Sequence, residues 1–269
     1  SAAESAPQAG LVEDIGRVLT PSTAAEERTA LFARLDAAAQ AGDPSAAYLI
    51  GSLYRRGADL SGLQLAKNPG RALKWLHAAA LGGELNAFAK LAETYADIGE
   101  PLEAMAWAQA YAYFLERDPS CRKECGDGYT AALLKRLYAE LPADAEEQIT
   151  KRSREVLLKV GPSFEYARLR HAQEAGQRKP SYAGSRRKVD FVDRSESRPM
   201  PPAGIAEFVV RVDADGAIRD AWVLDSLPRA DLAAELRATL LTMKLEAGAG
   251  DRYAIVPLVF DDRRLSVRK

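Results

Sequence analysis

The chain is poor in the residues that carry most enzyme chemistry. Its 269 residues include only two cysteines and two histidines. His77 and His171 lie far from the cysteines in sequence, which gives no spacing typical of a zinc site. No phosphate-binding glycine loop and no G-x-S-x-G nucleophile motif occurs. We therefore expect no catalytic residues, no cofactor and no metal, in a protein that is not an enzyme.

Aromatic residues and excess charge of either sign are also scarce. Aromatic side chains make up 7% of the chain, whereas hydrophobic residues, many of them alanine and leucine, make up 47%. This composition favours closely packed helices over a β-sandwich. The formal net charge of −1 gives no general attraction to nucleic acid. No run of about 18 apolar residues occurs, so we expect no membrane span.

The two cysteines, Cys121 and Cys125, are four residues apart in a loop-like run. On a helix this spacing puts the two Cα atoms about 6 Å apart, which a disulfide can bridge. A disulfide and a pair of unbridged thiols both fit the sequence. A disulfide would indicate an oxidising compartment.

Residues 37–111 carry the same pattern twice. A shift of 41 positions places Tyr54 on Tyr95, and a shift of 32 places Trp75 on Trp107. A period of this length is typical of α-solenoids, in which paired helices stack. We therefore expect these four residues to pack inside successive antiparallel helix pairs.

The doubled pattern resembles the Sel1-like repeat, a relative of the tetratricopeptide repeat. That pattern reads A-x-x-x-L-[GA]-x-x-Y-x-x-G, a variable loop, then A-x-x-W-x-x-x-A-A-x-x-G. The first copy matches through Ala46–Gly57 and Ala72–Gly83, and the second through Ala87–Tyr95 and Ala104–Ala110. The resemblance implies an α-solenoid over about residues 30–115.

Helix-capping signals place the ends of these helices. Thr23 and Glu26 have the spacing of a capping box that begins the first clear helix. Gly42 should end it in a left-handed conformation. Asp43 and Asn68, each followed by proline, should cap the two helices that follow.

Two more helices are expected after residue 127 as a cap for the repeat. The second should break at Gly161 and Pro162, and one last helix should follow the break. Between Tyr166 and Val189 there are seven lysines or arginines and one acid, Glu174. This stretch fits a solvated linker, and the alternative is contact with an anionic surface.

The C-terminal residues predict a small α+β unit. Two alternating strands meet at Asp215 and Gly216, a strong hairpin signal. A helix capped by Asp231 follows, and then a strand over residues 253–262 in which Pro257 suits an edge position.

This unit is similar to the C-terminal domain of TonB-type proteins. The family's F-x-P after the helix is replaced here by Leu245–Ala247, so the resemblance implies the fold and leaves open whether the domain takes part in energy transduction. The matching positions are Pro202, Gly204, Phe208–Val210, Asp213, Gly216, Ser226 and Val259–Phe260.

The sequence as a whole predicts a mainly α protein. Residues 1–22 form an N-terminal tail, 23–176 the Sel1-like α-solenoid of antiparallel helix pairs with capping helices, 177–203 a basic polar linker, and 204–269 the α+β domain of β-hairpin, helix and strand. The resemblance to TonB-type proteins implies the periplasm of a Gram-negative envelope. The small, polar start of the chain fits a mature N-terminus left by removal of a signal peptide, or an artificial start.

The expected function is a non-enzymatic scaffold that binds other proteins, of unspecified identity. Its C-terminal domain would bind a partner by adding the partner's strand to an exposed sheet edge. The alternative is an accessory factor that binds cell-wall material or a cell-wall enzyme. Exposed aromatic residues in one groove would favour that alternative, and buried Trp75 and Trp107 would count against it. The expected edge residues are Tyr253, Ile255, Val256, Val259 and Phe260.

Overall fold

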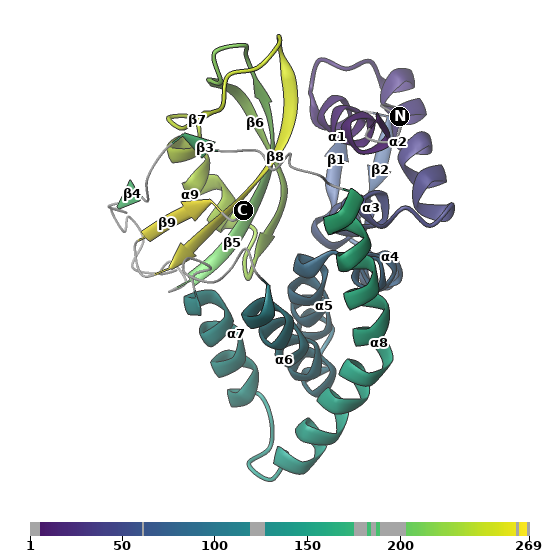
Figure 1. Cartoon of the computed structure of the whole chain (residues 1–269), viewed down its shortest axis with the longest axis vertical. Helices are drawn as coiled ribbons and strands as arrows, with labels where there is room; N and C mark the ends of the chain where they lie inside the picture. The colour runs from purple at the N-terminus through teal and green to yellow at the C-terminus, as the bar shows by residue number, and fades with distance from the viewer. Residues whose placement is uncertain are drawn as a thin grey trace.

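The computed structural model shows a mainly helical protein with a small antiparallel sheet formed near the C-terminus (Figure 1). It describes residues 6–60, 62–118, 127–174, 182–183, 187–188, 203–261 and 264–267. The helices before the sheet are α1 (Ala6–Leu19), α2 (Ala25–Gln40), α3 (Pro44–Arg56), α4 (Pro69–Leu81), α5 (Leu85–Asp97), α6 (Pro101–Arg117), α7 (Asp127–Ala139) and α8 (Glu146–Glu174).

The caps predicted for α3 and α4 are confirmed. The side chain of Asp43 accepts a hydrogen bond from the backbone N–H of Ala46, and that of Asn68 accepts one from Arg71. Each cap satisfies a backbone donor that the first turn of a helix leaves without a partner. Gly42 has a φ of 95°, as expected for the end of the preceding helix.

The capping box predicted at Thr23 is wrong. The residue at the N-cap of α2 is Ala24, and no side chain caps this helix. Thr23 instead lies in the turn before the helix, where its backbone N–H donates to the carbonyl of Thr20. The helix therefore begins one residue later than the box requires, which moves Thr23 outside it.

The break predicted at Gly161 and Pro162 is also wrong, because α8 continues through both residues. A proline inside a helix removes one backbone hydrogen bond and crowds the carbonyl four residues earlier, here that of Leu158. Pro162 and Leu158 both lie on the exposed side of α8, where water can solvate that carbonyl. Val160 and Phe164 are buried on the opposite side and hold the helix on its neighbours.

The main sheet has the strand order β4-β9-β8-β5-β6 with antiparallel pairing throughout. Two short hairpin strands, β1 (Ala58–Leu60) and β2 (Leu63–Leu65), connect α3 to α4. Strands β3 and β4 fall within the residues predicted to be a linker; β3 pairs with β7 and β4 with β9. The bounds are β3 Tyr182–Ala183, β4 Arg187–Lys188, β5 Ala203–Val212, β6 Ile218–Leu227, β7 Lys244–Leu245, β8 Arg252–Asp261 and β9 Arg264–Val267.

Strand β5 is buried on both faces, which places the sheet between two helical layers. Phe208 and Val210 join a core with α9 (Asp231–Leu240). Ile205 and Val209, which alternate with them, join the core of the N-terminal helices. The helical part and the sheet therefore share one hydrophobic core.

Residues Ala6–Leu19, within the segment predicted to be a tail, form helix α1. Ile15 and Val18 are fully buried, and α1 packs against α2, β5 and β8. The apolar residues of this segment therefore have a helical neighbour on one side and the sheet on the other. Neither contact is visible in a local sequence pattern.

Gly16 gives a direct test of how α1 packs on the sheet. A Cβ atom at this position would lie 2.2 Å from Cδ1 of Tyr253 on β8. We expect Gly16→Val to lower the free energy of unfolding by about 1–3 kcal/mol, because the ring must move out of a packed site. Adding Tyr253→Ala should recover part of the loss, and Gly10→Val, which meets nothing within 4 Å, should change little. Urea unfolding of the four proteins measures this, and equal effects at Gly10 and Gly16 would contradict the contact.

Candidate functional site

Four charged side chains are buried where the helices meet the sheet, and we call this cluster the ionic junction. Arg55 of α3 and Lys90 of α5 supply two positive charges, and Glu207 of β5 and Asp225 of β6 supply two negative charges. Their exposed fractions are 6%, 1%, 3% and 1%. Charged groups are rarely buried to this degree unless they are paired, so the geometry of the pairs decides what the cluster does.

Arg55 holds β6 with a two-pronged contact. Its Nε lies 2.8 Å from Oδ2 of Asp225 and its Nη2 lies 2.6 Å from Oδ1. The same Nη2 donates to the backbone carbonyl of Ser226 at 2.5 Å. This planar fork matches a carboxylate in both distance and direction, which a lysine could not do.

Lys90 lies between the two carboxylates. Its Nζ donates to Oε2 of Glu207 at 2.5 Å and lies 3.3 Å from Oδ2 of Asp225. It also donates to Oγ of Ser52 at 2.5 Å and lies 4.0 Å from the centre of the Tyr48 ring. An ammonium group can donate three hydrogen bonds, and Lys90 directs two of them to Glu207 and Ser52.

Two neutral side chains complete the shell around Glu207. The hydroxyl of Tyr48 donates to Oε1 at 2.5 Å, and Nδ2 of Asn86 donates to the same oxygen at 3.1 Å. Across the junction, the helices therefore supply hydrogen-bond donors and positive charge, while the sheet supplies acceptors and negative charge. This separation fixes one position of the sheet on the helices.

Burial by itself would raise the pKa of Asp225, but its surroundings reverse that effect. The charges of Arg55 and Lys90, with hydrogen bonds from Arg55 and the backbone N–H of Ser226, hold the pKa of Asp225 below its usual value. Burial and the neighbouring Glu207 raise the pKa of Tyr48. At neutral pH, Asp225 is therefore ionised and Tyr48 keeps its proton as a donor.

The sequence analysis missed the ionic junction, although two signals for it are present. Glu207 interrupts an otherwise apolar face of β5 between Ile205 and Val209. Ser52 and Arg55 lie on the face of α3 that carries Tyr48, at helical spacing. A charged residue on a buried strand face indicates a buried partner, but no local pattern identifies which one.

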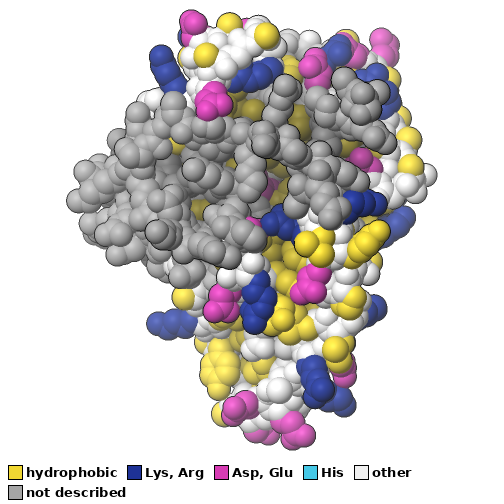
Figure 2. Space-filling model, in the orientation of Figure 1, with side chains coloured by type: hydrophobic (Ala, Val, Ile, Leu, Met, Phe, Trp, Pro, Cys, Tyr) yellow, Lys and Arg dark blue, Asp and Glu magenta, His cyan; other side chains and the backbone are white. Residues whose placement is uncertain are grey.

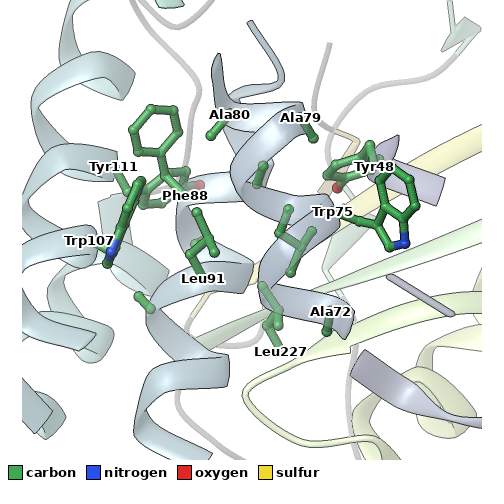
Figure 3. Close-up of a cluster of buried hydrophobic side chains, with 14 of the residues drawn as sticks. Tyr48, Ala72, Trp75, Ala79, Ala80, Phe88, Leu91, Trp107, Tyr111 and Leu227 are labelled. Carbon is green, nitrogen blue, oxygen red and sulfur yellow. The ribbon is translucent and has the colours of Figure 1, made fainter. Parts of the chain in front are cut away.

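The residues predicted to pack inside the repeat lie as follows. Trp75 and Trp107 (Figure 3) are 7% and 3% exposed. Tyr54 is buried and Tyr95 is half-buried. Trp107 packs against Phe88, with ring centres 5.6 Å apart. Cys121 and Cys125, for which the sequence left a disulfide and unbridged thiols both open, lie outside the residues that the structure describes.

The sheet edge predicted along Tyr253–Phe260 is wrong for its second half. Residues Leu258–Asp261 of β8 pair with β9, so this half of the strand is internal. Val256, Val259 and Phe260 are buried, and Tyr253 and Ile255 are half-buried next to α1. The prediction failed for this second half because β9, which pairs with it, lies outside the hairpin, helix and strand of the recognised pattern.

Strand β6 lies at the edge of the sheet, and arginine side chains engage its backbone. The carbonyl of Ala221 accepts from Nε of Arg237 at 2.9 Å, and that of Ser226 accepts from Arg55. These contacts reduce the acceptors that β6 offers to an incoming strand. The arginines thus occupy two backbone acceptors of this strand.

His77 is partly buried between α4 and its neighbours. Its Nε2 lies 3.0 Å from the hydroxyl of Tyr95, and its ring packs edge-on against Trp107 with centres 4.7 Å apart. Burial, with the charge of Lys159, lowers the pKa of His77 to about 4. The neutral ring is therefore the form that the fold favours.

This shift predicts a loss of stability on acidification. The unfolded histidine has a pKa of about 6.5, so the unfolded state takes up the proton first as the pH falls. Stability that is present above pH 6.5 should be lost as the pH falls toward 4, by about 2–3 kcal/mol at pH 4.5. Urea unfolding at several pH values measures this, with His77→Phe as the variant that lacks the titration. The same pH dependence in both proteins would contradict the assignment.

No group of three or more metal-ligating side chains occurs among the described residues, and none of the helices described is long and apolar enough to cross a membrane. No protein family, curated protein or solved structure matches this chain.

Proposed function

We propose that the chain is a non-enzymatic scaffold that binds other proteins in the periplasm of a bacterial cell envelope. In this proposal α3–α6 form a Sel1-like solenoid, and the sheet with α9 forms a TonB-like unit packed against it. The observation that carries the proposal is the ionic junction. Its four charges bind one another across the contact between the helices and the sheet.

A buried ionic contact supports a scaffold because it favours one arrangement over others. Buried ion pairs contribute little net stability compared with apolar side chains, but a mispaired arrangement would leave charges without partners. Only one register of the sheet on α3 and α5 satisfies both carboxylates. The two parts of the chain would then present their surfaces to a partner as a single rigid body, which lowers the entropy lost on binding.

A second polar contact extends the same rigidity to α7. Glu93 of α5 is buried and accepts from the hydroxyl of Tyr129 at 2.9 Å and from Arg136 at 2.5 Å. Helix α7 in turn contacts β5 and β8. Helices, sheet and capping elements are therefore joined at several points.

The helices, rather than a sheet edge, provide the surface in this proposal. Arginine side chains engage the edge strand β6, and β9 pairs with part of β8. Exposed apolar side chains occur on the helices and at their ends instead, among them Leu81, Tyr113 and Ile98, the residue after α5. Exposed apolar residues of this size are common at protein contacts.

The alternative function, binding of cell-wall material through exposed aromatic side chains, has less support. It requires an open groove of aromatic residues, and the two repeat tryptophans are candidates for one. Trp75 and Trp107 are both buried. They pack the helices together and are not free to stack on a sugar ring.

Site-specific photo-crosslinking in a Gram-negative envelope tests the proposed function. The photoreactive residue p-benzoylphenylalanine would replace Leu81, Ile98 or Tyr113 in the full chain, and exposed Glu116 would serve as the control. We expect a discrete adduct with another protein from at least one of the three apolar positions and none from Glu116. Loss of that adduct in an Ile98→Glu chain would locate the contact. Adducts from none of the three positions in folded protein would overturn the proposal.

A further inference from the structure

We draw no further inference here: the strongest candidate, the outer surface of α8 with its exposed side chains Leu158, Tyr166 and Leu169, carries none, because exposed acidic and basic residues balance along this helix, mixed with hydrophobic ones over the same part of the molecule in Figure 2, and nothing in the residues that the structure describes shows what covers this surface.

Discussion

Replacing Asp225 with alanine is expected to destabilise the protein by about 3–5 kcal/mol. The change leaves Arg55 and Lys90 buried with one carboxylate between them, and removes both prongs of the arginine contact. An unpaired buried charge is far more costly than the loss of a surface pair. Urea unfolding followed by circular dichroism gives the free energy directly.

Two companion variants make this result specific. Asp220→Ala removes a carboxylate of the same strand whose pair with Arg211 is partly exposed, and should cost less than about 1 kcal/mol. Combining Arg55→Met with Asp225→Leu replaces a charged pair by apolar side chains and should recover much of the loss. A loss at Asp225 no larger than that at Asp220 would show that the ionic junction is not stabilised as described.

Replacing Phe88 with alanine is expected to cost about 3–5 kcal/mol. Phe88 is fully buried on α5, and its ring centre lies 5.2 Å from that of Phe114 on α6 and 5.1 Å from that of Phe164 on α8. Truncation removes these contacts and leaves a cavity that three helices must share. Thermal or urea unfolding measures the loss.

The matched control for Phe88 is Tyr138→Ala, an exposed aromatic residue of α7. It should change the free energy of unfolding by less than about 0.5 kcal/mol. Phe88→Leu should fall between the two, because leucine fills part of the cavity. Similar losses at Phe88 and Tyr138 would contradict the aromatic cluster as a centre of the helical core.

The sequence predicted the elements whose signals are local. Asp43 and Asn68 each cap a helix through a backbone N–H three residues away, so the residues that decide the helix start adjoin in sequence. The turn at Gly216 followed from the same kind of signal, with a φ of 82° that favours glycine. These features depend on short-range sterics and hydrogen bonds, which a sequence pattern records.

Three predictions failed because distant parts of the chain supply a contact that the local pattern does not show. Helix α8 continues through Pro162 because its inner face is packed on α4 and α6, and the second half of β8 is internal because β9 pairs with it. Helix α1 packs against β5 and β8, whose first residues, Ala203 and Arg252, follow Ala6 by 197 and 246 positions. In each case tertiary packing outweighed the local signal.

At the candidate site, the ionic junction likewise depends on contacts between residues that are far apart in the sequence. The sequence by itself determined that the chain is mainly helical, with a duplicated helical pattern and a hairpin, helix and strand near its C-terminus. Only the tertiary structure decided that Arg55 meets Asp225 across 170 residues and Lys90 meets Glu207 across 117. The physical reason is that a buried charge requires a partner in space, and no spacing along the chain specifies which residue that partner is.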